Sequence, residues 1–317
     1  MKIKKPLFGF WHKVDRLLGI DIRRNFARLV ELSYCNYSYQ LEACAHIELG
    51  EIDGSDEAII SAIKNTLKQN PSKTKDTAIA LSHLAAIFKE VEVDANLSAE
   101  ETIKFLRFNL AQQVSDSKTD ISFDYQVIDS PTPTNSNTTL QVIAVRHERV
   151  GKLVALLQAA NLKPKIIDVD VYALERAVRW QLKNIEGLVA IINIDYGNIF
   201  IVVIDSKKIV YVYEDFVGNE SLGSIAQVVE QLDLKLQLLH SVLSQPLGQI
   251  ILAGEKAVLF GLDDAVNSQL NIHTMIANPF LGMQLSPAVS QELIQKIAPK
   301  MLISCGLALR VDDEYKN

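Results

Sequence analysis

The stretch GIDIRRNFARLVELS, residues 19–33, predicts a strand that ends in an acidic residue, a tight turn and a second strand. In folds that bind nucleotide phosphates with such a hairpin, the turn consists of Gly, Ser and Thr, because backbone N–H groups must approach the phosphate oxygens closely. Here the turn is Arg23, Arg24, Asn25 and Phe26. The stretch therefore has the layout of a phosphate-binding hairpin with different side chains in its turn.

A second hairpin of the same layout lies near the middle of the chain. When Ile20-Asp21 is aligned with Ile194-Asp195, both copies predict a meander of three strands, then a helix with an apolar stripe, then a buried strand. The predicted elements are 17–22, 27–34, 39–49, 56–70 and 77–82 in the first copy, and 188–195, 199–205, 209–216, 221–245 and 249–254 in the second. This order is that of the two ribonuclease H-like domains of the actin, Hsp70 and sugar-kinase superfamily. The sequence therefore predicts an α/β protein with an actin-like ATPase fold, hinged by two apolar helices, 170–182 and 305–310.

The segment between the two copies, residues 83–167, predicts an inserted subdomain. Its elements follow the ferredoxin-like order βαββαβ. The predicted ranges are 86–94, 98–114, 121–128, 140–146, 147–161 and 164–169. Residues 129–139 contain only Asp, Ser, Pro, Thr and Asn, which predicts a surface loop.

The composition favours a cytosolic protein. The 317 residues suffice for two domains, and the net charge of -6 is spread without long blocks of one sign, so nucleic acid is not an expected partner. Three scattered cysteines without a CxxC pair fit a reducing compartment. The most apolar window, 187–205, has polar residues at its middle, so no membrane-spanning segment is predicted. Residues 1–16 form a basic leader with aromatic side chains, which either rests on an anionic membrane face or packs on the first strand.

Several segments resemble the PilM family, the cytoplasmic actin-like proteins of type IV pilus assembly, which includes MshI-type members. The most specific is 142–177, in which a strand, a helix, a Leu-Lys-Pro turn, a strand and the helix DVYALERA follow one another. The other matching segments are LLGIDI (17–22), RLVELS (28–33), EVEVDANLSAEE (90–101), DISFDYQVI (120–128), ILAGEKAVLFGLDDAVNSQL (251–270), ANPF (277–280) and GLALR (306–310). Together these segments span nearly the whole chain.

The resemblance implies an FtsA-like division of the chain. Subdomain 1A would comprise 17–82 and 168–186, the inserted subdomain 1C would be 83–167, and domain 2, with parts 2A and 2B, would be 187–317, all after the leader. The resemblance also implies an adaptor at the inner face of the inner membrane. Such an adaptor binds the short cytoplasmic N-terminal segment of a PilN-like inner-membrane protein, in a groove between 1A and 1C, and connects it to pilus motor ATPases.

The resemblance further implies a candidate site for ATP with Mg²⁺ at the two hairpins and a later glycine turn. The candidate residues are Asp21, Arg23, Arg24, Asn25, Asp195, Gly197, Asn198 and Gly254. The acids and some glycines of the family's motifs are present, but most small and hydroxyl residues are replaced, and Glu255 adds a negative charge. Losing several amide contacts to phosphate, at about 1–3 kcal/mol each, predicts weak or absent ATP binding and no efficient hydrolysis.

Alternatives remain open for the first turn. Either Arg23 or Arg24 binds phosphate bidentately in place of the backbone, or both arginines form a solvated hairpin tip. Asp21 and Asp195 either contribute to the nucleotide site or accept hydrogen bonds from the N–H groups of their own turns. The chain has no GxxxxGK[ST], HExxH or GxSxG motif, so no catalytic residue and no metal ligand is predicted. The alternative functions are a nucleotide-dependent switch, a slow ATPase or small-molecule kinase on the same fold, and an actin-like filament.

Overall fold

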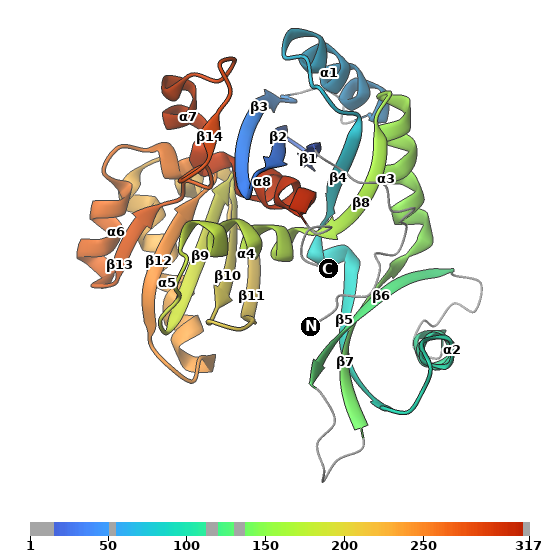
Figure 1. Ribbon diagram of the computed structural model, residues 1–317. Coiled ribbons are helices and arrows are strands. Elements are labelled where there is room, and N and C mark those ends of the chain that lie inside the picture. The colour runs from blue at the N-terminus through green and yellow to red at the C-terminus, as the bar shows by residue number, and fades with distance from the viewer. Residues whose placement is uncertain (1–15, 51–54, 112–119, 130–136, 313–317) are drawn as a thin grey trace.

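The computed structural model describes residues 16–50, 55–111, 120–129 and 137–312. Two large sheets lie on either side of the helices α4 (Asp170–Gln181) and α8 (Leu302–Ala308) (Figure 1). A smaller, three-stranded sheet extends from the six-stranded one, which is the first sheet along the chain. None of the described helices is both long and apolar enough to cross a membrane.

The first sheet contains the meander that the sequence predicts. Strands β1 (Arg16–Ile22), β2 (Phe26–Cys35) and β3 (Ser38–Glu48) pair antiparallel in turn, and the helix α1 (Asp56–Gln69) leads to β4 (Asp76–Leu81), which runs parallel to β1. The helix begins after Ser55, whose side chain accepts a hydrogen bond from the N–H of Ala58.

The second sheet repeats this arrangement. Its elements are β9 (Leu188–Asp195), β10 (Asn198–Ile204), β11 (Ile209–Phe216), η2 (Asn219–Leu222), α5 (Ile225–Val242), β12 (Leu247–Ala253), η3 (Lys256–Val258), α6 (Leu262–Leu270) and β13 (His273–Ile276). The strand orders, β3-β2-β1-β4-β8 and β11-β10-β9-β12-β13, correspond one to one. The predicted duplication is therefore confirmed, and with it the actin-like ATPase fold. The helix α6 and the strand β13, which complete the second copy, were not predicted from the sequence.

Layers on both faces explain why the central strands read as continuous apolar runs. Every residue of β9 is buried, as expected for a strand that is covered on each side. On one face, β9 and β10 pack against the apolar stripe of α5, which includes Val228, Leu232 and Leu236. On the other face, Ile191 and Val202 join the cluster that contains α4 and α8.

The inserted segment differs from the prediction in its sheet. Its elements are η1 (His83–Ala85), β5 (Ala86–Asp94), α2 (Ala99–Ala111), β6 (Ile121–Asp129), β7 (Asn137–Arg146), α3 (His147–Ala159) and β8 (Lys163–Val169). The order along the chain is the predicted one, but β5, β7 and β6 form a three-stranded sheet, whereas β8 pairs parallel with β4 in the first sheet. The ferredoxin-like interpretation is therefore wrong, because α3 buries Leu156 and Leu157 against the first sheet and returns the chain to it. The strand β7 begins inside the predicted loop 129–139, and residues 130–136 lie outside the described residues.

The C-terminal part also crosses between sheets. After β14 (Gln284–Leu285), which pairs with β3, come α7 (Gln291–Ile297), η4 (Ala298–Met301), α8 and η5 (Leu309–Asp312). A Cβ atom on Gly19 of β1 would lie 2.1 Å from the carbonyl oxygen of Ser304, and one on Gly306 would lie 1.7 Å from that of Ala173 in α4. These close approaches seat α8 on both β1 and α4. The assignment of 187–317 to domain 2 alone is corrected accordingly, because β14 and α8 pack on the first sheet. We call the first sheet with α4 and the inserted segment the first half, and the second sheet with its helices the second half.

Candidate functional site

The two hairpin turns lie against each other between the halves of the molecule. The first turn joins β1 to β2, and a hydrogen bond of 2.9 Å from the Arg23 N–H to the Phe26 carbonyl closes it. The ring of Phe26 stacks on the ring of Tyr196 in the second turn, with centroids 5.7 Å apart. This contact brings side chains from both halves together.

An arginine of the first half is bound to an aspartate of the second. Arg28 in β2 donates two hydrogen bonds, of 2.9 and 2.7 Å, to the carboxylate of Asp195 at the end of β9, and both side chains are buried. Asp195 also accepts hydrogen bonds of 2.7 Å from the Asn193 amide and from the N–H of Glu255. Burial by itself raises the pKa of Asp195, but the Arg28 guanidinium and these hydrogen bonds together outweigh burial and lower that pKa.

Arg28 is positioned by its strand and by an aromatic ring. In the ladder of β1 and β2, Arg28 lies opposite Asp21. Its guanidinium lies 3.7 Å from the centroid of the Phe26 ring, within the range of a cation–π interaction. Its Nη2 is also 3.8 Å from Oε2 of Glu255. These partners compensate for burying a guanidinium, which would be strongly unfavourable for an unpaired charge.

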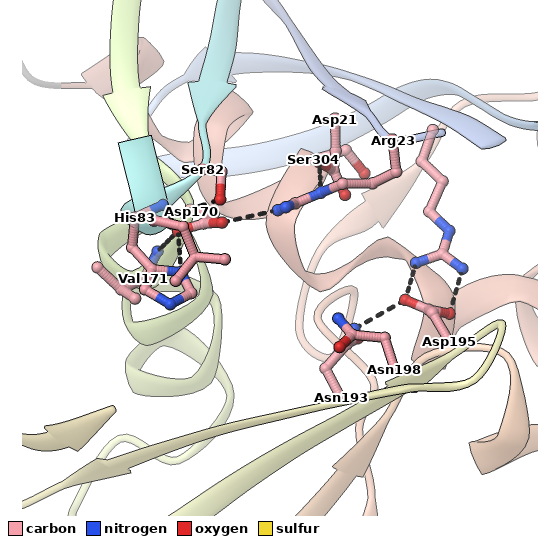
Figure 2. A network of polar contacts seen from close by, with 12 residues as sticks. Asp21, Arg23, Ser82, His83, Asp170, Val171, Asn193, Asp195, Asn198 and Ser304 are labelled. Carbon is pink, nitrogen blue, oxygen red and sulfur yellow. Dashed lines mark hydrogen bonds and ion pairs between the residues drawn. The ribbon is translucent and has the colours of Figure 1, made fainter. Parts of the chain in front are cut away.

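A second arginine, Arg23, lies between two buried carboxylates of the first half. Figure 2 shows it donating one hydrogen bond of 2.9 Å to Asp21 and another of 2.9 Å to Asp170. Asp170 also accepts hydrogen bonds from the backbone N–H groups of His83 and Val171. Burial raises the pKa of both carboxyls. At Asp21, burial is a larger effect than the nearby arginines, so the pKa is raised. At Asp170, hydrogen bonding to His83 and the charge of Arg23 together outweigh burial, so the pKa is lowered.

His83 connects this network to the second sheet. Its ring stacks on Phe200 in β10, with centroids 4.8 Å apart and an interplanar angle of 4°. Its Nε2 lies 3.6 Å from the Glu214 carboxylate in β11, which accepts a hydrogen bond of 2.6 Å from the Asn198 side chain. The imidazole therefore lies between carboxylates of the two halves, Asp170 and Glu214.

The two glycines of the candidate site are required by the backbone around them. Gly197 has a φ of +82°, and a Cβ atom there would lie 2.7 Å from the backbone of Gly218. Gly254 has a φ of +88°, and a Cβ atom there would lie 2.6 Å from the backbone of Ile194. Their presence is thus explained by chain packing, without reference to a ligand.

Most of the predicted site residues come together, but not all. Asp21, Arg23, Asp195 and Asn198 take part in the contacts just described, and the backbone of Gly254 lies next to Glu255 and hence to Asp195. The side chain of Arg24 is exposed. Asn25 contributes its backbone carbonyl, which accepts a hydrogen bond of 2.8 Å from the N–H of Leu49.

Arg28 and His83 were missed as site residues by sequence reasoning. Arg28 had a signal, because it stands in the strand stretch FARLV among apolar residues, where a charged side chain needs a buried partner. His83 had none, because its partners come from separate elements, α4, β10 and β11.

The donor set does not fit a Mg²⁺-nucleotide. Such a site needs carboxylate oxygens for the metal and backbone amides or cations free for phosphates. Here Asp195 is bound bidentately by Arg28, and Asp21 is paired with Arg23. Within the described part of the chain, no three His, Cys, Asp or Glu side chains are grouped in a way that would hold a metal ion. Of the two arginines predicted as phosphate binders, Arg23 is paired with carboxylates, whereas Arg24 is exposed.

Known structures and a family model are similar to most of this chain. The structure titled "PilM-PilN type IV pilus biogenesis complex" has a TM-score of 0.76 and 19% sequence identity, covering 95% of this chain and 99% of that one. The ethanolamine utilization protein EutJ from Carboxydothermus hydrogenoformans has a TM-score of 0.49 and 14% identity, covering 93% and 89%. The cytoplasmic domain of EpsL, an inner membrane component of the type II secretion system of Vibrio cholerae, has a TM-score of 0.47 and 12% identity, covering 88% and 92%. The family model of the type IV pilus assembly protein PilM matches residues 19–235 and 224–312. Because this family model matches most of its length, the chain belongs to the PilM family of type IV pilus assembly proteins.

Proposed function

We propose that this protein is a cytoplasmic adaptor of type IV pilus assembly whose nucleotide cleft is degenerate. In this proposal it binds the N-terminal cytoplasmic segment of a PilN-like inner-membrane protein, sits at the inner face of the inner membrane through that partner, and connects it to pilus motor ATPases. Membership of the PilM family and the similarity to a PilM-PilN complex support the partnership. The main observation in favour of an adaptor without nucleotide is the Arg28–Asp195 pair. It occupies the region where a nucleotide-dependent protein would need an unpaired carboxylate and unpaired cations to bind the metal ion and the phosphates.

Two ion pairs support the degenerate cleft. The Arg28 guanidinium already neutralises Asp195, and the Arg23 guanidinium is already bound to Asp21 and Asp170. A phosphate or a metal ion would have to displace these buried partners, and leaving a buried charge unpaired costs about 3–5 kcal/mol. Binding of Mg-ATP would therefore have to repay that cost before it gained affinity.

An apolar surface beside the first sheet supports a peptide site. Where β4 leads through η1 into β5, Leu84 and Phe88 are 74% and 40% exposed. The ring of Phe88 lies 6.2 Å from that of Tyr172 in α4, so this surface joins the inserted subdomain to the first half. The strand β5 is also an edge of its sheet, so its outer backbone groups are available for an added strand. We expect apolar side chains of the partner segment to bind here.

The experiment is a binding titration with a labelled synthetic peptide of the PilN-like N-terminal segment. We expect binding in nucleotide-free buffer, and loss of at least tenfold in affinity for Phe88→Asp. The matched control is Phe260→Asp, because Phe260 is fully exposed in the second half and its replacement should leave the affinity unchanged. Binding that appears only with ATP would contradict the proposed adaptor and would support a nucleotide-dependent switch.

A thermal-shift titration with Mg-ATP tests the degenerate cleft separately. We expect no significant shift for the wild type. A shift of several degrees that is lost in Arg23→Ala would mean that Arg23 binds phosphate, and would contradict the degenerate cleft without affecting the peptide site.

A further inference from the structure

Cationic side chains gather at the end of the first sheet where its parallel strands begin. This basic end comprises Arg16, Lys68, Lys73, Lys75, Lys163 and Lys165. Strands β1, β4 and β8 run parallel in one sheet, so their first residues lie at the same end. Arg16 starts β1, Lys163 starts β8, and Lys73 and Lys75 directly precede β4. The N–H of Lys163 donates a hydrogen bond of 2.7 Å to the carbonyl of Lys75, and Lys68 lies in the last turn of α1, which leads to β4.

Few carboxylates offset these charges. Glu42 is buried and is bound by Arg16 at 2.7 Å and by Lys73 at 3.0 Å. The buried Glu31 accepts hydrogen bonds from the backbone N–H of Lys73, and Asp76 is the remaining acid at the strand starts.

Of the other four lysines of the basic end, Lys68, Lys75 and Lys163 are exposed and Lys165 is half-buried. Among the described residues, no ion pair is formed by Lys68, Lys75, Lys163 or Lys165. A protein with a net charge of -6 thus presents a positive surface at one end of one sheet.

An exposed aromatic side chain lies at the same end. Arg16 is opposite Ser33 in the ladder, and β2 turns back into β3 just beyond, at Asn36 and Tyr37. Tyr37 is 94% exposed. Tyrosine beside lysine is the combination found where proteins meet the lipid headgroup region. With strands about 4.8 Å apart, the row from this turn to β8 is roughly 15–20 Å long.

We propose that the basic end binds the headgroups of anionic phospholipids and holds the first half of the protein against a bilayer surface. A row along the end of a sheet suits a flat anionic surface better than a nucleic acid strand, which is usually bound in a groove with several stacking aromatics. The sequence that leads to Arg16 agrees, since it combines lysines with Phe8, Phe10 and Trp11. The inference concerns a different surface from the proposed peptide site and does not depend on it.

Cosedimentation of the full chain with vesicles tests the proposal. The probes are vesicles of phosphatidylcholine alone and of phosphatidylcholine with phosphatidylglycerol, each at low and high salt. The test variant carries Lys68→Glu, Lys75→Glu and Lys163→Glu. The control variant has the same change in net charge, with Lys104→Glu, Lys207→Glu and Lys208→Glu, which lie in α2 and in the turn before β11.

We expect the wild type and the control to bind phosphatidylglycerol vesicles at low salt and to be released at high salt. Since each lysine near an anionic surface contributes about fivefold to partitioning, the test variant should bind roughly 100-fold more weakly. Circular dichroism and unchanged peptide binding would show that the variant is folded. The proposal is overturned if the wild type ignores anionic vesicles, if it binds phosphatidylcholine equally well, or if the test variant binds like the control. Salt-dependent binding to duplex DNA without vesicle binding would also overturn it, in favour of a nucleic acid partner.

Discussion

Replacing Arg28 by methionine should destabilise the protein through Asp195 rather than through lost packing. Methionine retains much of the apolar length of arginine, but it removes both hydrogen bonds to the Asp195 carboxylate. Asp195 would then be a buried charge with only the Asn193 amide and the Glu255 N–H as partners. Removal of one partner of a buried ion pair costs about 3–5 kcal/mol of unfolding free energy.

The pH dependence distinguishes this mechanism from a packing defect. In the wild type the pKa of Asp195 is lowered, so its contribution to stability is present above about pH 3.9, the unfolded pKa, and is lost as the pH falls through the folded value. Without Arg28, burial becomes the larger effect and should raise the pKa of Asp195 above the unfolded value. The variant should therefore lose stability as the pH rises from about 4 through that raised value. The difference from the wild type should be largest at neutral pH and should shrink as the pH falls below about 4 through the lowered wild-type pKa.

Urea unfolding of the Arg28→Met, Asp195→Asn and double variants, followed by two optical probes, measures this. Coinciding transitions are required before free energies are compared, because a chain with two halves need not unfold in one step. The double variant should be more stable than the sum of the single changes predicts, with a coupling of about 0.5–3 kcal/mol. If Arg28→Met lay within about 0.5 kcal/mol of the wild type at neutral pH, as surface substitutions do, the assignment of Arg28 as the link between the halves would be refuted.

Three further results are expected. Gly306→Ala should lower the unfolding free energy by about 1–3 kcal/mol or more, the cost of overpacking, because the added Cβ would meet the α4 backbone. Urea unfolding measures this change, and a stability equal to that of the wild type would contradict the close contact between α8 and α4. Only the exposed Cys35 should react quickly with a thiol reagent at pH 8. Burial raises the pKa of Cys44 to about 12 and also raises the pKa of Cys305. Rapid reaction of all three thiols in the folded protein would contradict the burial of Cys44 and Cys305. Ser55→Ala should cost about 1 kcal/mol through loss of the α1 cap, whereas Ser55→Asp should restore most of it.

The features that the sequence predicted correctly are local ones. The meanders follow from alternating or continuous apolar runs separated by polar turns, and α1 follows from its spacing of isoleucines and from Pro71 after its end. The doubled order of these elements then limits the fold to one superfamily. These inferences use only the order of residues along the chain, so they can be made without coordinates.

The features that the sequence did not predict depend on which distant elements meet. The strand β8 reads equally well as the last strand of an inserted ferredoxin-like sheet, and only its pairing with β4 decides against that. The path of α8 back to β1 is set by two glycines, Gly19 and Gly306, whose need for close approach is visible only when the facing backbone is known. The partner of Arg28 lies 167 residues away, in the other half of the molecule.

The fold alone explains an acid and a glycine of the second turn. Gly197 is needed because the chain of Gly218 passes 2.7 Å from its Cβ position, whether or not a phosphate binds nearby. Asp195 is needed because Arg28 would otherwise be buried without a counter-charge. The first turn closes through a hydrogen bond from the Arg23 N–H to the Phe26 carbonyl, and the side chains of these two residues contact Asp21 and Tyr196, respectively. Both turns are thus held by contacts within the chain, which is what the proposed degenerate cleft requires.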